Sequence, residues 1–285
     1  MTSPKFFRPD KRLGQHFLRD PNLVNKIIRV SRFRESDRVL EIGAGMGDLT
    51  IPLARHVRQV VAVEKDSRLI PILGQRLSSG GIRNVELVNA DILSIDFLEL
   101  PLPWDKGVLV IGNIPFNISS PTLGKLIQHR KWVNRAILMF QLELARRLTA
   151  SPGTRDYGAI TVLLRYYATL TPLLVVPREA FYPRPKVGAQ VLEIDFEKPY
   201  PKRARDDEGF DRIVHAAFSH RRKTLINSLK AGLRDLPPDA LQWVLEQSAI
   251  DPRRRAESLD MEEFLRLGNA FVSLSLTKNG GGAIG

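Results

Sequence analysis

Residues 38–50, RVLEIGAGMGDLT, join a β-branched apolar run to a turn with glycine at positions 43, 45 and 47. Glycines this close together let the backbone turn sharply after a strand and approach a ligand closely. In open α/β folds, ligands bind at the carboxyl edge of the sheet, where such turns lie. The dinucleotide fingerprint is spaced G-x-G-x-x-G, whereas here the third glycine comes one residue early and Glu41 precedes the first. The stretch therefore predicts an α/β fold with a ligand loop of another kind.

Further apolar runs rich in β-branched residues follow at helix-sized intervals. They cover residues 59–64, 85–88, 108–111 and 136–140. Strands separated in this way indicate a mainly parallel sheet with helices on both faces. Two later runs, 173–176 and 191–196, are expected to add an antiparallel edge, which makes a predicted sheet of seven strands.

The glycine turn resembles the loop of class I methyltransferases, whose cofactor, S-adenosylmethionine, has no pyrophosphate. The resemblance implies the Rossmann-like fold of that class. Glu64 ends the second strand, where a carboxylate can accept both ribose hydroxyls, and Asp91 follows the third, where it can accept from the adenine amino group. An acid at a strand end can also be a helix cap. The predicted cofactor contacts in these segments are Glu41, Gly43, Gly45, Glu64, Lys65, Asp91 and Ile92.

The fourth strand leads into Asn113-Ile114-Pro115-Phe116. An adenine amino nitrogen is a poor nucleophile because its lone pair is delocalised into the ring, so an enzyme must hold it with the lone pair facing the methyl group. The Asn113 side-chain oxygen and the Ile114 carbonyl can each accept one of its hydrogens. Pro115 fixes the turn, and Phe116 offers a face on which a flipped base stacks. These four are the predicted catalytic tetrad, with Asn113 also a cofactor contact; an ordinary loop with a core phenylalanine is the alternative.

This tetrad resembles the Asn-x-Pro-Tyr/Phe motif of amino methyltransferases. Four further segments resemble the KsgA-type ribosomal RNA adenine-N6,N6-dimethyltransferases. They are KRLGQHFL (11–18), AFYPRPKV (180–187), FSHRRKTL (218–225) and IDPRRRAE (250–257). The resemblance runs from about residue 11 to about residue 272.

The resemblance implies roles for residues outside the glycine turn and the tetrad. Gln15, His16 and Leu18 are expected to fold over the methionine end of the cofactor, although His16 could equally be a packing residue. Phe181 is expected to lie beside the target base as a further catalytic residue, and would otherwise belong to the core.

Three positions depart from the family pattern. Gly188-Ala189 stand where Asp-Ser is common, so the hydrogen bonds of those side chains near the target loop are in doubt. Leu142 stands where lysine is usual and removes that charge. Phe116 replaces the commoner tyrosine, which keeps the stacking face and loses a hydroxyl.

Basic residues dominate the charge of the chain. Lys and Arg number 43 against 31 Asp and Glu, which gives a net charge of +12 and a pI near 10.2. This favours a polyanionic partner, because phosphate contacts release condensed counterions, although some proteins are basic only for solubility. By the resemblance, Arg221, Arg222 and Lys223 are expected to bind RNA and would otherwise be a solvated helix face. Residues 253–255 are expected either to bind RNA as well or only to cap the small domain.

Residues 199–209 are polar, charged and rich in proline, which indicates a linker. The predicted domains are an S-adenosylmethionine-binding catalytic domain over 1–198 and a small α-helical RNA-binding domain over 210–277, followed by a flexible tail over 278–285. The chain has no apolar run near the length of a membrane span and no secretory signal, so we expect a cytoplasmic protein. Zero cysteines exclude thiolate chemistry, and five scattered histidines predict no metal site.

The resemblance also implies a substrate, the 16S ribosomal RNA of the small subunit or its precursor. Two adjacent loop adenosines near its 3′ end would each receive two methyl groups during ribosome biogenesis, from a monomeric enzyme. Loop bases are partly unstacked, so extruding one costs less than from a duplex. Two alternatives stay open: an Erm-type methyltransferase of large-subunit RNA, which differs in its carboxy-terminal domain, and an assembly factor whose binding matters more than its catalysis.

Overall fold

The computed structural model describes residues 8–279, which form two compact units. The first unit takes the chain up to Ala145 together with Ala168–Lys198. The second takes Arg146–Tyr167 together with the chain from Pro199 on. The predicted flexible tail lies, from residue 280, outside the described residues. No helix in the described part of the chain is long and apolar enough to cross a membrane.

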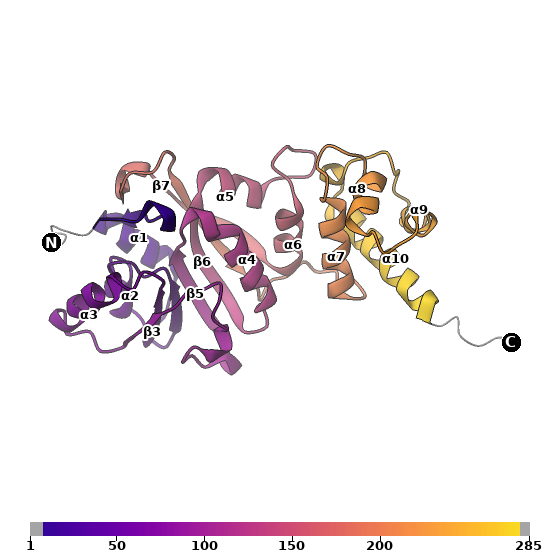
Figure 1. Cartoon of the computed structure of the whole chain (residues 1–285). Helices are drawn as coiled ribbons and strands as arrows, with labels where there is room; N and C mark the ends of the chain where they lie inside the picture. The colour runs from indigo at the N-terminus through magenta and orange to yellow at the C-terminus, as the bar shows by residue number, and fades with distance from the viewer. Residues whose placement is uncertain (1–7, 280–285) are drawn as a thin grey trace. The chain divides into compact units, whose positions relative to one another are not determined.

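The first unit is built on a seven-stranded sheet in the order β4-β3-β2-β5-β6-β9-β7 (Figure 1). Its strands are β2 (Arg38–Ile42), β3 (Gln59–Glu64), β4 (Val85–Asn89), β5 (Val108–Asn113), β6 (Val133–Gln141), β7 (Thr169–Val176) and β9 (Ala189–Asp195). Strands β2 to β6 run parallel, while β9 is antiparallel to both β6 and β7. This confirms the predicted mainly parallel sheet with an antiparallel edge. The strand order reverses between β2 and β5, which is the usual ligand-binding point of such folds.

Helices flank this sheet, which explains why its central strands are nearly continuous apolar runs. The helices along this part of the chain are α1 (Pro21–Ser31), α2 (Thr50–Ala54), α3 (Leu69–Ser79), α4 (Ser119–Gln128) and α5 (Leu142–Thr149). Helix α1 begins at Pro21 because the Asp20 carboxylate caps the N–H groups that follow. Its Ile27 shares one core with Leu53 of α2 and with Val39 and Ile111 of the sheet.

A short antiparallel ribbon, not predicted from the sequence, pairs β1 (Phe17–Leu18) with β8 (Phe181–Tyr182). Partners in register project to the same side of such a ribbon, and successive residues project to opposite sides. Phe17 therefore shares a side with Tyr182, while Leu18 and Phe181 face the other way and belong to the main core. The ribbon ties the amino-terminal segment to the loop before β9.

The second unit is helical (Figure 1). Its helices are α6 (Ala159–Tyr167), α7 (Asp207–Ala217), α8 (Leu225–Gly232), α9 (Pro238–Gln247) and α10 (Met261–Asn279). Helix α7 begins inside the predicted linker because the Asp206 carboxylate caps the Gly209 N–H at 2.6 Å. The ring of Phe210 packs on Tyr166 with centroids 4.1 Å apart, so α6 belongs with these helices although it lies between two sheet strands in sequence. Short 3-10 helices cover Lys11–Leu13, Phe97–Glu99, Trp104–Lys106, Phe116–Ile118, Arg178–Ala180 and Ala256–Ser258.

Candidate active site

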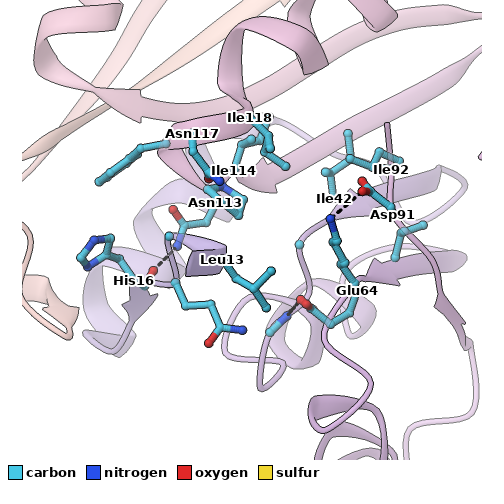
Figure 2. A pocket seen from close by; sticks show the side chains of 18 of the residues that line it. Leu13, His16, Ile42, Glu64, Asp91, Ile92, Asn113, Ile114, Asn117 and Ile118 are labelled. Atoms are coloured by element: carbon cyan, nitrogen blue, oxygen red, sulfur yellow. Dashed lines mark hydrogen bonds and ion pairs between the residues drawn. The ribbon is translucent and has the colours of Figure 1, made fainter. Parts of the chain in front are cut away.

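A pocket opens in the first unit at the carboxyl ends of the central parallel strands (Figure 2). Its empty volume is about 910 Å³, including the space open to solvent. This lies within the range of about 300–1,000 Å³ that is typical of small-molecule sites. Four segments form it: the amino-terminal residues 12–17, the glycine turn, the ends of β3 and β4, and residues 113–118 after β5. In residues 8–279, no group of three His, Asp or Glu is placed to hold a metal ion.

Most of the predicted site residues meet in this pocket. Those that line it are Gln15, His16, Gly43, Gly45, Glu64, Lys65, Asp91, Ile92, Asn113, Ile114, Pro115 and Phe116. Leu18, Glu41 and Phe181 are not among its lining residues. Residues 12–14 and 117–118 also line it and were not predicted. The resemblance of segment 11–18 to the family is the signal from which residues 12–14 could have been predicted.

Glu64 holds the glycine turn in place. Its Oε2 accepts from the Gly45 N–H and its Oε1 from the Asp66 N–H, each at 2.8 Å. Gly45 has a φ of +58°, and a Cβ there would lie 3.1 Å from the Phe17 ring, so the turn needs glycine. Burial raises the pKa of Glu64, although both N–H bonds oppose this shift. Each carboxylate oxygen has a second lone pair and can still accept from a ligand hydroxyl.

Asp91 forms an ion pair at the same side of the pocket. Its Oδ2 lies 2.7 Å from Lys65 Nζ, and its Oδ1 accepts from the Leu93 N–H at 3.0 Å. Burial by itself raises the pKa of Asp91, but Lys65 and the Leu93 N–H hold it below its usual value. The group is therefore a charged acceptor, as recognition of an amino group requires.

Glu41 lies behind the glycine turn and is only 1% exposed. Burial raises its pKa to about 8, and the carboxylates of Glu64 and Asp48 add to that shift. Within the described part of the chain, its Oε2 has no hydrogen-bond partner. Because Glu41 does not line the pocket, its predicted contact with the cofactor stays a prediction.

Asn113 ends β5 with its side chain held in one orientation. Its Nδ2 donates to the main-chain carbonyl of His16 at 2.8 Å. A carbonyl can only accept, so the amide nitrogen must face it and Oδ1 is left as an acceptor (Figure 2). Nothing in residues 8–279 donates to that oxygen. Gly112, just before it, permits this position, because a Cβ there would lie 2.6 Å from the Ile42 carbonyl oxygen.

Phe116 and His16 form an aromatic pair at the pocket. Their ring centroids are 5.3 Å apart and the ring planes are inclined by 29°. The Nδ1 of His16 donates to the Pro183 carbonyl at 2.7 Å. His16 therefore lines the pocket and also packs on Phe116. Through its hydrogen bond it connects Phe116 to Pro183, which follows the ribbon. Phe181 is only 4% exposed and lies in the core, so its place beside a target base stays a prediction.

The predicted RNA-binding residues of the second unit are exposed on a loop between α7 and α8, not on a helix face. They are Arg221, Arg222 and Lys223. The Leu225 N–H donates to the Arg254 carbonyl at 2.6 Å, so residues 251–255 lie against this loop. The Glu257 carboxylate lies 3.9 Å from a guanidinium nitrogen of Arg221 and of Arg255. We call residues 221–223 and 253–255 the basic loop cluster.

Two departures from the family pattern are neighbours in space. The Gly188 carbonyl accepts from the Leu142 N–H at 3.1 Å. A Cβ at Gly188 would lie 2.8 Å from the Val176 carbonyl oxygen and 3.5 Å from Leu142 Cδ1. Leu142 and Gly188 are therefore packed against each other.

The chain is similar to known proteins over most of its length. The family model described as ribosomal RNA adenine dimethylase matches residues 7–272. Ribosomal RNA small subunit methyltransferase A of Desulforapulum autotrophicum is 45% identical over 264 residues, which are 93% of this chain and 92% of the relative. The protein of the same name from Shouchella clausii is 38% identical over 272 residues, 94% of this chain and 91% of the relative.

Two solved structures extend the similarity to the whole fold. A dimethyladenosine transferase from Plasmodium falciparum has a TM-score of 0.75 at 29% identity, and the match covers 91% of this chain and 98% of that one. The 23S rRNA methyltransferase ErmE has a TM-score of 0.65 at 28% identity, with 90% and 99% covered. By the extent of the family match and the identity to these relatives, the chain belongs to the ribosomal RNA adenine dimethylase family.

Proposed function

We propose that this chain uses S-adenosylmethionine to dimethylate the N6 of two adjacent adenosines in a loop near the 3′ end of 16S ribosomal RNA. The observation that carries the proposal is the fixed acceptor of Asn113, which faces Glu64 and Asp91 across one pocket (Figure 2). One side of the pocket suits a nucleoside, and the other suits an exocyclic amino group.

The pocket residues fit S-adenosylmethionine by their chemistry. Glu64 retains lone pairs for two ribose hydroxyls, and the charged Asp91 can accept from the adenine amino group. The turn at Gly43 and Gly45 presents main chain and no side chain to the ligand, with φ of +77° and +58°. The unpaired oxygen of the buried Glu41 is a further polar group beside this turn. When bound, the cofactor supplies a methyl group on a positively charged sulfur.

The tetrad orients the amino group that is methylated. Asn113 Oδ1 and the Ile114 carbonyl each accept one N6 hydrogen, so the nitrogen lone pair turns towards the cofactor side. Phe116 stacks on the extruded adenine, a contact worth about 1–3 kcal/mol. His16, stacked on Phe116 and bonded to Pro183, keeps that ring in place. After transfer, the cationic nitrogen is strongly acidic and loses its proton to water, so no residue needs to act as a general base.

The basic loop cluster supplies the second half of the function, the binding of RNA. The guanidinium of Arg222 and the ammonium of Lys223 are exposed, and no carboxylate among the described residues lies within ion-pair distance of either. Cations left unpaired in this way can neutralise backbone phosphates. The proposal includes that the enzyme acts as a monomer in the cytoplasm.

Small-subunit RNA is preferred over large-subunit RNA as the substrate because of the relatives. Those named small subunit methyltransferase A are 38–45% identical to this chain, whereas ErmE, named for 23S RNA, is 28% identical. A comparison of methylation of the two RNAs therefore decides which one is the substrate.

Unmethylated small and large subunits, each incubated with the enzyme and labelled S-adenosylmethionine, test the proposal. We expect N6,N6-dimethyladenosine at two adjacent positions near the 3′ end of the small-subunit RNA, mapped by mass spectrometry. Small subunits that already carry these methyl groups serve as the control and should take up no label. Label in the large-subunit RNA alone would overturn the substrate assignment.

A further inference from the structure

Tyr182 is an aromatic side chain that the fold leaves half-exposed. It is 51% exposed, while the other large apolar side chains exposed in the described part of the chain are aliphatic. An aromatic ring carries a large hydrophobic surface, so a half-exposed ring offers a face on which a planar ligand can stack. Tyr182 is not needed for the core, which its neighbour Phe181 enters instead.

The ribbon places Tyr182 on the pocket side. Tyr182 is paired in register with Phe17, which lines the pocket, so both side chains project from the same side of the ribbon. The next residue, Pro183, accepts the hydrogen bond from His16, and His16 stacks on Phe116. Tyr182 is therefore one residue away from the contact that holds the aromatic ring of the tetrad.

Arg19 covers part of the Tyr182 ring. Its guanidinium carbon lies 4.7 Å from the ring centroid, and the side chain is exposed. Arg19 directly follows strand β1, and its N–H donates to the Ala180 carbonyl at 2.8 Å. An exposed ring with a cation beside it is a combination that binds unpaired nucleotides, because the ring stacks on a base while the cation neutralises a phosphate.

We propose that Tyr182, supported by Arg19, is the stacking site for the nucleotide next to the target adenosine. The proposal rests on the proposed function and assigns it a further binding residue. When one adenosine is extruded into the pocket, its neighbour in the loop loses a stacking partner. Tyr182 replaces that partner, and Arg19 contacts the phosphate between the two nucleotides. Since every base has a π face, the site accepts any neighbour, including a second adenosine.

Steady-state methylation of unmethylated small subunits by Tyr182→Ala, Tyr182→Phe and the unaltered chain tests the site. Tyr182→Ala should raise the KM for subunits about fivefold to a hundredfold, the range for one stacked base, with kcat nearly unchanged. Tyr182→Phe should restore the KM because it keeps the ring. Arg19→Ala should raise the KM less and lower its salt dependence.

Two controls separate RNA binding from a structural effect. Arg83→Ala removes an exposed cation before β4, at the opposite edge of the sheet beside Arg38 and Arg58, and should leave the KM unchanged. Affinity for S-adenosylmethionine, measured by calorimetry, should be equal in all variants. A normal KM for Tyr182→Ala, or a loss confined to kcat, would overturn the stacking site alone. If the unaltered chain transferred no methyl group to small subunits, both this inference and the proposed function would fall.

Discussion

Glu64 is bonded to the main chain at both carboxylate oxygens, and this arrangement links the cofactor loop to the end of β3. The Gly45 N–H donates to this carboxylate at 2.8 Å from a turn in which Gly45 has a left-handed φ of +58°. The same carboxylate is the proposed acceptor for the ribose hydroxyls. At the scale of single residues, one buried acid therefore both shapes the loop and recognises the ligand.

We expect Glu64→Ala to weaken binding of S-adenosylmethionine by about 1.5–3 kcal/mol, because charge-assisted hydrogen bonds to the ribose are lost. Isothermal calorimetry measures this directly. Glu86→Ala, which removes an exposed acid from β4, is the matched control and should bind normally. Equal affinity in the Glu64 variant would refute its role as the ribose acceptor.

Glu41 gives the chain a pH-dependent stability. Its pKa in the folded chain is raised by burial to about 8, from an ordinary value of 4.5. Between these pH values the folded chain keeps a proton that the unfolded chain has lost, so this group makes the free energy of unfolding fall as pH rises. We expect Glu41→Gln, which cannot titrate, to lose less stability between about pH 5 and about pH 8 than the unaltered chain. Urea denaturation at both pH values measures it, and an unchanged difference would contradict the prediction.

The residues of the pocket could be predicted to very different degrees. The positions of Glu64, Asp91 and Asn113 in one pocket could be predicted, because a parallel sheet brings the carboxyl ends of its strands to one edge. The pairing of Phe17 with Tyr182 could not be predicted, because it depends on the register of a ribbon only two residues long, which has no periodicity to read. The role of Phe181 beside the target base stays a prediction. The contact between Gly188 and Leu142 likewise joins residues far apart in sequence.

At the scale of elements, the close approach of β2 and β5 determines where the tetrad lies. Gly112 is paired with Ile42 across these strands, and its missing side chain is what lets them meet. Apolar runs predicted both strands, but not how closely they pack. Capping by Asp206 moved the start of α7, and the packing of Phe210 on Tyr166 assigned α6 to the helical unit. Both are contacts of single side chains that hydrophobic periodicity does not report.

We expect Gly112→Ala to lower the free energy of unfolding by about 1–3 kcal/mol, because its Cβ would overlap the Ile42 carbonyl oxygen. Gly124→Ala, inside α4 with open space at the Cβ position, is the matched control and should raise stability by about 0.4–1 kcal/mol. Chemical denaturation of both variants measures the difference. A stable Gly112 variant with normal cofactor affinity would contradict the tight packing of β2 on β5.

At the scale of the whole molecule, the net charge of +12 can contribute to RNA binding mainly through the cations that are not paired with carboxylates. Many arginines of the chain are held by carboxylates, as Arg212 is by Asp235 at 2.5 Å and Arg254 by Glu263 at 2.5 Å. The charge count predicted a polyanionic partner, but it could not separate paired cations of this kind from Arg222 and Lys223, which have no carboxylate within ion-pair distance among the described residues. The three-dimensional structure makes that separation.

We expect the double variant Arg222→Ala, Lys223→Ala to bind small subunits more weakly and with a flatter salt dependence. Each lost phosphate contact removes about 0.7–0.9 from the slope of log affinity against log salt concentration. Arg212→Ala, already paired, is the control and should keep the slope. An unchanged slope in the double variant would mean that the RNA follows another path over the chain.

Single-turnover methyl transfer to unmethylated small subunits, with mono- and dimethyladenosine quantified by mass spectrometry, tests the central role of Asn113. Asn113→Ala removes the acceptor that orients N6, so transfer should slow by about 10²–10³, far more than cofactor or RNA affinity falls. Phe116→Ala removes only a stacking face, so it should slow the first and second methylations alike. Near-normal transfer by Asn113→Ala would contradict the account, because a group other than the Asn113 side chain would then have to orient N6.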